Sequence, residues 1–274
     1  MIKVTSLSDN INDNKKMWAA EGNCILIEVA SIKILYDTGR DMDVVLHNLN
    51  VLDISPDDIN YIILSHGHMG HSGAFRGCYS QFKNATIIYG EYFHLPKFKS
   101  KSAELKSVKN TDVLSGIEKD HEYISVRDYY EIVKGYVYVF TIPIVKKQIF
   151  ENKYLVQVDN KYAVDEFKEE LAVCINSSNG LLVFSGCAHR GVYNTVLRAQ
   201  QLSNNSNVYA VLGGTHILND RELADEYCTD MQKLNVSRVY PSHCTGYLGR
   251  YYIKEQMKEK YGYFSTGVSL EFDD

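Results

Sequence analysis

The sequence predicts an α/β protein in which two mixed β-sheets pack face to face and helices cover their outer sides. Strand-like runs alternate with amphipathic helical stretches along the chain, which is typical of sheets covered by helices. Each half of the chain opens with a predicted β-hairpin. With 274 residues, 45% of them hydrophobic, the chain is long enough to bury a sizeable core. We expect a single domain over residues 1–274.

The first half contains a hairpin, two helices and a buried strand. Two β-rich runs, residues 24–29 and 32–36, are close enough in sequence to pair. Apolar residues recur with helical spacing over 42–49. Ser55, followed by proline and two acids, is typical of a helix N-terminus. A continuous apolar run over 61–64 then predicts a buried strand.

The second half repeats this order. Two strands, residues 171–175 and 181–184, flank the dipeptide Asn179-Gly180, which is a strong signal for a two-residue hairpin turn. The remaining predicted elements are a helix over 192–202, a strand over 208–212, a helix over 223–234 and a strand over 238–240.

The middle of the chain, about residues 95–165, is less regular and rich in lysine and tyrosine. We expect it to be an insertion that covers one end of the sandwich, because long insertions often form lids or binding loops. Its lysines would steer phosphate groups or simply form a solvated surface. Its tyrosines, at 129, 130, 136 and 138, would stack on a planar ring or pack in the core. The lysines concerned are Lys97, Lys99, Lys101, Lys106 and Lys109.

Composition argues against several classes of protein. A net charge of −5 disfavours nucleic acid as the main partner, because no global positive field exists to neutralise phosphates. No apolar run approaches the ~20 residues of a membrane helix, and the first residues lack the apolar stretch of a secretory signal. Six cysteines occur without a C-x-x-C pair, which indicates reduced, buried thiols. We therefore expect a cytoplasmic protein with no nucleic-acid or membrane partner.

Histidines carry the functional signal, since six of the nine directly follow predicted strands. In layered α/β folds the carboxyl ends of strands form the rim where ligands bind, so these side chains should converge. Several neutral imidazoles around one point suit zinc. Any one of them alone would more simply be a hydrogen-bonded core residue, but the six together favour a metal site. They are His66, His68, His71, His189, His216 and His243.

These histidine motifs resemble those of the metallo-β-lactamase superfamily. Residues 65–73 read S-H-G-H-M-G-H-S-G and are similar to the signature S-H-G-H-x-D-H-x-G. Residues 37–39 match the upstream D-T-G, and residues 185–189 and 241–246 match later motifs. The set G-C-A/S-H, G-G-x-H and P-x-H-C-T-G resembles one branch. That branch contains archaeal 7,8-dihydropterin-6-methyl-4-(β-D-ribofuranosyl)aminobenzene-5′-phosphate synthases and bacterial metal-dependent hydrolases.

The resemblance covers nearly the whole chain and implies a four-layer αββα sandwich, α/β (α+β) in class, with a metal site on one edge. The chemistry implied is that of one or two zinc ions, with iron or manganese as alternatives. The implied ligands are His66, His68 and His189 for the first metal, and His71 and His243 for the second.

The resemblance also implies roles for other residues. His216 would face the same cavity as a substrate contact, proton donor or extra ligand, and either His216 or His243 would act as general acid. Asp37 would accept a ring N–H and fix the tautomer of a liganding histidine, or would be a turn aspartate. Cys187 sits where the wider superfamily often has a bridging aspartate, and it would be a thiolate ligand or a buried structural thiol.

Two positions depart from the family pattern. Gly70 replaces the aspartate that ligates the second metal and orients the attacking water. Glu21 lies in a segment that resembles the branch's A-E-H-G but lacks its histidine, and we expect it to support the site. Three readings follow: a one-metal enzyme, a second site rebuilt with Cys187, His216 or Glu21, or a protein that binds without catalysis.

The expected function is therefore that of a metal-dependent hydrolase or related transferase. It would use a zinc-activated water on a phosphorylated or ester small molecule, with pterin-related compounds as candidates. The alternative is a catalytically impaired member that binds a ligand or metal. We expect a small anionic substrate as partner, and a homodimer is left open.

Overall fold

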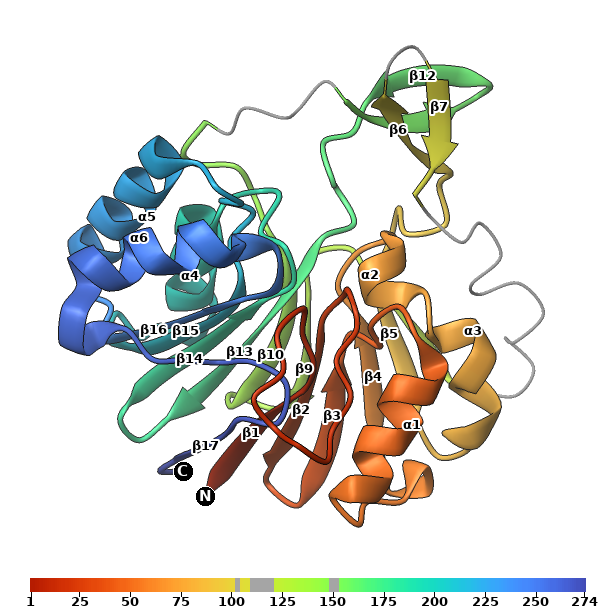
Figure 1. The fold of residues 1–274 in the computed structure, drawn as a ribbon, viewed down its shortest axis with the longest axis horizontal. Helices are drawn as coiled ribbons and strands as arrows, with labels where there is room; N and C mark the ends of the chain where they lie inside the picture. The colour runs from red at the N-terminus through yellow and green to blue at the C-terminus, as the bar shows by residue number, and fades with distance from the viewer. Residues whose placement is uncertain (102–103, 109–120, 148–152) are drawn as a thin grey trace.

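The computed structural model describes residues 1–101, 104–108, 121–147 and 153–274. Its two large sheets pack face to face, with helices α1 to α3 outside one and α4 to α6 outside the other (Figure 1). This is the expected four-layer αββα arrangement, and the predicted fold class is confirmed. Within the described part of the chain, no helix is both long and apolar enough to cross a bilayer.

The first large sheet has seven strands in the order β17-β1-β2-β3-β4-β5-β8. Its strands are β1 (Ile2–Ser8), β2 (Cys24–Val29), β3 (Ile32–Tyr36), β4 (Tyr61–Leu64), β5 (Thr86–Gly90), β8 (Tyr123–Val126) and β17 (Ser269–Phe272). The predicted hairpin is confirmed as β2 and β3, whose turn residues Ala30 and Ser31 have φ values of 48° and 66°. Two consecutive positive φ values match the right-handed strand twist, which explains the tight connection.

The second large sheet has six strands in the order β16-β15-β14-β13-β10-β9. Its strands are β9 (Tyr129–Val133), β10 (Val137–Thr141), β13 (Leu171–Ser177), β14 (Gly180–Ser185), β15 (Val208–Gly214) and β16 (Arg238–Ser242). Ser177 pairs with Gly180 in the hairpin of β13 and β14, so residues 178 and 179 form its turn. The turn therefore lies one residue before the predicted Asn179-Gly180.

The helices cover the outer faces and are short around the histidine-rich segment. They are α1 (Met42–Val51), α2 (Met69–Ser72), α3 (Phe75–Cys78), α4 (Val192–Ser203), α5 (Arg221–Lys233) and α6 (Tyr247–Met257). Four 3-10 turns complete the set: η1 (Pro56–Asp58), η2 (Tyr79–Gln81), η3 (His243–Thr245) and η4 (Lys258–Lys260). Ser55 caps η1 through a capping box, as its sequence predicts.

Three apolar clusters hold the four layers together. Ile25 and Ile27 of β2 point into the cluster between the two sheets, while Leu26 points into the cluster under α1. Successive side chains of a strand face opposite sides, so a central strand buried on both sides is apolar throughout. A third cluster lies between the second sheet and α4 to α6. This packing fixes where the strands end, and therefore where the histidines lie.

The expected insertion is smaller than residues 95–165. Residues 123–141 contain β8, β9 and β10, which are strands of the two large sheets. The added part is a separate four-stranded sheet in the order β12-β11-β6-β7, which projects from one end of the sandwich (Figure 1). Its strands are β6 (Lys97–Lys101), β7 (Glu104–Ser107), β11 (Tyr154–Val158) and β12 (Lys161–Val164).

Candidate metal centre

Six histidines come together at one edge of the sandwich, where strands of both sheets end. Three come from the first sheet, following β4 or lying at α2, and three from the second sheet, following β14, β15 and β16. In chain order they are His66, His68, His71, His189, His216 and His243. The rings of His66 and His189, from opposite sheets, have centroids 5.0 Å apart. The convergence expected from the sequence is thus seen in the structure.

His66, His68 and His189 form a first triad that is suited to a metal ion. One ring nitrogen from each lies within 4.8 Å of the others. Their Nε2 atoms are buried, and none has a hydrogen-bond partner among the described residues. Buried polar atoms are nearly always paired, so three unpaired nitrogens facing one space indicate a missing ligand. Burial, followed by the neighbouring histidines and Lys97, lowers the pKa of these imidazoles well below its usual value, which keeps their lone pairs available.

Asp37 sets the tautomer of the first of these rings through Ser65. The hydroxyl of Ser65 donates to Oδ2 of Asp37 at 2.9 Å, so its oxygen is free to accept from Nδ1 of His66 at 3.0 Å. The proton of His66 is therefore on Nδ1, and its Nε2 carries the lone pair. The backbone N–H of Ser65 also donates to Oδ1 of Asp37, at 2.7 Å.

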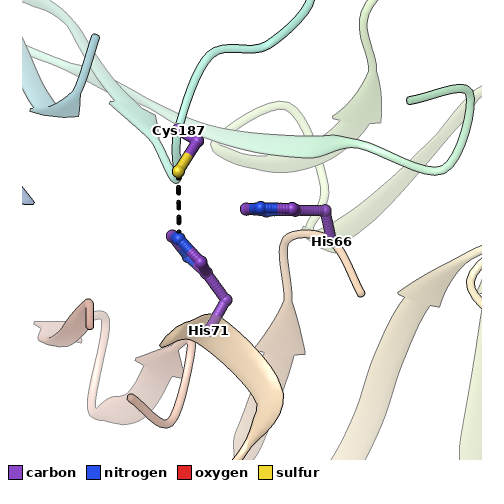
Figure 2. A group of neighbouring side chains, drawn as sticks. All are labelled: His66, His71 and Cys187. Atoms are coloured by element: carbon purple, nitrogen blue, oxygen red, sulfur yellow. Dashed lines mark hydrogen bonds between the residues drawn. The ribbon is translucent and has the colours of Figure 1, made fainter. Parts of the chain in front are cut away.

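A second cluster lies against the first and contains His71, His243 and Cys187. Nε2 of His71 lies 3.1 Å from Nε2 of His243 and 3.1 Å from Sγ of Cys187. Figure 2 shows His66, His71 and Cys187 converging from the segment after β4, from α2 and from the segment after β14. Oδ2 of Asp37 accepts from Nδ1 of His71 at 2.6 Å. Asp37 thus contacts the second cluster directly and the first through Ser65, which is typical of a residue that orients ligand rings.

Glu170 positions the loop that carries His189. Its carboxylate accepts the backbone N–H groups of His189 and Arg190, both at 2.8 Å. Burial raises the pKa of Glu170 to about 7. Gly186 permits the same loop to approach the first sheet, because a Cβ there would lie 2.3 Å from Oγ of Ser65. Sequence reasoning missed Glu170, which directly precedes a predicted strand and has no motif around it.

The added sheet and the segment after it supply two aromatic side chains to the triad. Phe167 stacks on His189 with ring centroids 3.8 Å apart and planes 3° from parallel. Tyr154, at the start of β11, lies 5.1 Å from His68 between centroids. These rings exclude water from one side of the triad. Neither was singled out from the sequence, where no spacing pattern distinguishes them from other aromatic residues.

A cavity of about 230 Å³ opens beside the triad. Its wall includes His189 and His216, whose rings lie 4.4 Å apart between centroids. The lining also includes Lys146, which pairs with Glu226 at 2.6 Å and Asp230 at 2.5 Å. The cavity lining therefore includes both imidazoles and charged groups, which suits a small polar molecule.

Several predicted site residues lie elsewhere. Glu21 forms an ion pair with Arg40, and its side chain is 65% exposed, so it does not reach the histidines. Lys97 is buried and pairs with Asp165 at 2.5 Å and Glu169 at 2.8 Å, so it is not available to a substrate phosphate.

The other lysines and the tyrosines of the middle segment lie on the added sheet and on the second large sheet. Lys101 and Lys106 are exposed on the added sheet, and Lys99 lies over the ring of Tyr154 at 5.4 Å. Lys109 lies outside the described residues. The tyrosines at 129, 130, 136 and 138 belong to β9, β10 and their turn, where Tyr138 is buried in the core.

Comparisons with known proteins agree with this architecture. The family model of the metallo-beta-lactamase superfamily matches residues 18–243. A 7,8-dihydropterin-6-methyl-4-(beta-D-ribofuranosyl)-aminobenzene-5'-phosphate synthase of Methanocaldococcus jannaschii is 29% identical, covering 99% of this chain and 97% of its own. An uncharacterized protein of that organism is 27% identical, covering 90% and 91% of the two chains.

Solved structures share the fold. Tm1679, a metal-dependent hydrolase of the beta-lactamase superfamily, superposes with a TM-score of 0.85 at 23% identity, covering 100% of both chains. A diphosphatase from the PhnP family gives a TM-score of 0.58 at 11% identity, with coverage of 100% of this chain and 98% of its own. These likenesses support the fold.

Proposed function

The chain belongs to the metallo-β-lactamase superfamily, and we propose that it is a metal-dependent hydrolase or related transferase acting on a phosphorylated or ester small molecule. The observation that carries this proposal is the first triad, His66, His68 and His189. Three buried nitrogens with lone pairs, gathered from both sheets, form the donor set of an open zinc site. A structural core would not leave three such atoms unpaired.

The donor set fits zinc, with iron or manganese as alternatives, and these three residues would hold it. A bound divalent cation would supply Lewis-acid polarisation of a carbonyl or phosphoryl oxygen and a water that ionises near neutral pH. The protein contributes the rest. Asp37 and Ser65 hold His66 in the tautomer that presents Nε2, and Phe167 keeps water from one face of His189.

His216 is the residue we assign to substrate contact and proton transfer. It lines the cavity next to His189, so a molecule in the cavity can reach both rings. An imidazole in this place can donate a proton to a leaving oxygen, a contribution of about 10²- to 10⁴-fold in rate. His243, the other residue expected in this role, lies against His71 in the second cluster.

The cavity and the relatives together suggest the class of substrate. The Methanocaldococcus jannaschii relative is named for a product that combines a dihydropterin, a ribofuranosyl-aminobenzene and a 5'-phosphate. A planar heterocycle could rest against Tyr154, and exposed Lys147 at the cavity wall could meet a phosphate. We therefore propose a small anionic substrate, with pterin-related phosphates as the first to test.

Gly70 supports a second candidate function, which is ligand or metal binding without turnover. It offers no carboxylate to orient a water where the superfamily signature has aspartate. Metal binding alone is compatible with the triad, and only an activity measurement separates the two functions.

Metal content and turnover of bis-p-nitrophenyl phosphate, measured on the same preparation, test this proposal. We expect bound metal and turnover in the wild-type chain, with turnover lost and metal content lowered in His189→Ala. His94→Ala is the matched control, because His94 is an exposed histidine outside the cluster. Metal without turnover of this ester or of pterin-related phosphates would favour the binding function. A wild-type chain that takes up no metal from zinc-containing medium would refute both.

A further inference from the structure

We propose that a cavity lined by arginine and lysine side chains, separate from the cavity beside the triad, binds the phosphate group of a small organic molecule. We call it the arginine cavity after Arg127, Arg190 and Arg198 in its lining. Its volume is about 810 Å³, and among the described residues it shares none of its lining with the cavity beside the triad. None of the six strand-end histidines lines it. The inference therefore goes beyond the proposed metal-dependent function and does not depend on it.

Strand ends of both large sheets build the arginine cavity. Glu91 follows β5, Arg127 follows β8, and Thr141 ends β10. Backbone hydrogen bonds hold these ends together. The N–H of Glu91 donates to the carbonyl of Val126 at 3.0 Å, and the N–H of Thr141 donates to the carbonyl of Asp128 at 2.8 Å. The walls are therefore fixed by the strands, as in ligand sites that exist before the ligand arrives.

Positive charge exceeds negative charge in the lining of the arginine cavity. Four cationic side chains and two carboxylates line it, although the chain as a whole has a net charge of −5. Three of the cations have a carboxylate partner, and the pairs are Arg127–Glu91, Arg198–Asp128 and Lys168–Glu166. In each pair at least one side chain is more than half exposed, and water screens such pairs, so a phosphate can exchange for the carboxylate. The fourth cation, Arg190, forms no ion pair with a described residue.

Arg190 is fixed in place while its charge stays uncompensated. Its Nε donates to the carbonyl of Ile142 and its Nη1 to the carbonyl of Glu166, both at 2.5 Å. Carbonyl groups are neutral, so they orient the guanidinium without cancelling its charge. A guanidinium has five N–H donors, and these two contacts leave three more in the same plane. A planar cation held in this way suits the paired oxygens of a phosphate.

Arg198 supplies an unsatisfied donor as well. It lies on α4, and its Nε is buried without a hydrogen-bond partner in the part of the chain that the structure describes. Buried polar atoms are nearly always paired, so this one indicates an absent acceptor. Because Arg198 lines the arginine cavity, the acceptor we assign to it is an oxygen of the bound phosphate.

The remaining lining residues favour a phosphorylated organic molecule over the phosphate ion alone. Ile142 and Pro143 contribute apolar surface, and Tyr92 is 42% exposed. An aromatic ring and an apolar wall beside arginines suit a ring or carbon chain attached to the phosphate. The volume of about 810 Å³ also lies within the range of about 300–1,000 Å³ in which proteins bind small organic molecules.

The segment after β14 contributes to both cavities. His189 lines the cavity beside the triad, and the next residue, Arg190, lines the arginine cavity. The carboxylate of Glu170 accepts the backbone N–H groups of both residues at 2.8 Å. A phosphate held by Arg190 is therefore bound one residue away in sequence from a predicted metal ligand. Phosphate in the arginine cavity must accordingly be distinguished from phosphate at the metal.

Calorimetric titration of the full chain with phenylphosphonate, a phosphate analogue that hydrolysis does not cleave, tests the proposal. We expect it to bind more tightly than inorganic phosphate, and we expect Arg198→Gln to weaken both about tenfold or more, because a charge-assisted hydrogen bond is lost. Lys168→Gln changes an exposed residue and should weaken binding about twofold to fivefold. Arg221→Gln is the matched control, because Arg221 forms its ion pairs on α5 and α6, outside the arginine cavity, and its affinity should equal that of the wild type.

His68→Ala separates the arginine cavity from the metal centre. It removes a triad ligand and should keep the binding that Arg198→Gln weakens. Loss of binding in His68→Ala, together with wild-type affinity in Arg198→Gln, would place the anion at the metal centre and overturn this inference while leaving the proposed function intact. A chain that takes up no metal yet binds phenylphosphonate through Arg198 would refute the proposed function and support this inference. A wild-type chain that binds none up to about 10 mM would overturn the inference.

Arginine labelling of the unmodified chain does not depend on the folding of variants. Phenylphosphonate should slow the reaction of phenylglyoxal with Arg127 and Arg190, read by peptide mass spectrometry, and leave the rate at Arg221 unchanged. Malonate should protect less, because its two charges lie on separate carboxylates. Equal labelling with and without phenylphosphonate would overturn the site. Stronger protection by malonate, or tighter binding of inorganic phosphate than of phenylphosphonate, would overturn the ligand class.

Discussion

Replacing Asp37 with asparagine perturbs the hydrogen bonds beneath both histidine clusters. Oδ2 of Asp37 accepts from Nδ1 of His71 at 2.6 Å and from the hydroxyl of Ser65 at 2.9 Å, while Oδ1 accepts the backbone N–H of Ser65 at 2.7 Å. Asparagine keeps the shape but exchanges one acceptor oxygen for an NH₂ donor. Whichever way the amide lies, a donor of His71 or Ser65 then faces another donor.

The structure gives the expected size of the effect. Losing a carboxylate that orients a metal-binding imidazole lowers metal affinity about 10- to 100-fold, because the ring no longer presents one defined nitrogen. That range corresponds to about 1.4 to 2.8 kcal/mol. Asp37 is fully buried, so water cannot replace the missing acceptor. We therefore also expect the free energy of unfolding of the metal-free protein to fall by about 1–3 kcal/mol.

Competition with a chromophoric chelator measures the zinc affinity of Asp37→Asn and of the wild-type chain. Asp53→Asn is the matched control, since Asp53 is an exposed turn residue with a φ of 57°, a conformation that asparagine adopts readily. The reasoning would be refuted if Asp37→Asn bound zinc as tightly as the Asp53→Asn control.

Three further predictions concern the second cluster, pH and the buried ion pairs. Gly70→Asp should raise the affinity for a second cation about tenfold and favour manganese, since an oxygen ligand is added. The Cβ of the new side chain would lie at an ordinary 3.7 Å from Cε1 of His243. Unchanged metal content would contradict the placement of a second cation beside residue 70. Burial lowers the pKa of the imidazoles of His66, His68, His189 and His243. The unfolded chain therefore binds protons first as pH falls below about 6.5. The free energy of unfolding of the metal-free protein should then fall by about 1.4 kcal/mol per pH unit for each such histidine. Thermal unfolding from pH 8 to 5 measures this loss, and a flat profile would contradict it. Lys97→Met should lower the free energy of unfolding by about 3–5 kcal/mol, because two buried carboxylates lose their partner. Denaturant titration measures this loss against the control Lys101→Met, which changes an exposed lysine. Equal stabilities of the two variants would count against the prediction.

Local patterns in the sequence were sufficient for much of the fold. The hairpin of residues 24–29 and 32–36 and the strand 61–64 have the predicted bounds. Their apolar runs are continuous, and their turns carry local signals. Because each strand end is set by its own run, the six histidines could be placed at a common edge before any pairing was known.

The middle of the chain could not be assigned in the same way. β8 pairs with β5, and β10 pairs with β13, each across a long separation in sequence. Such pairings depend on packing between distant segments, which no local period reports. The same limit applies to Phe167, whose contact with His189 depends on where the added sheet lies.

Side-chain roles were predictable only where a motif named them. Asp37 was expected to orient a ligand ring, and the structure shows that it contacts His71 directly and His66 through Ser65. Cys244 was part of a matched motif, yet nothing in its spacing indicated that its sulfur lies beside Cys187 and His243. The direction of a side chain after a strand end depends on the turn that follows, here η3.

Anomalous diffraction from crystals of the zinc-loaded chain, collected on both sides of the zinc edge, most directly tests whether the strand-end histidines hold a metal. We expect a peak bonded to Nε2 of His66, His68 and His189, at about 2.0–2.1 Å from each nitrogen. A zinc-loaded crystal with no anomalous peak among these three atoms would contradict the account, whatever metal is found elsewhere on the protein.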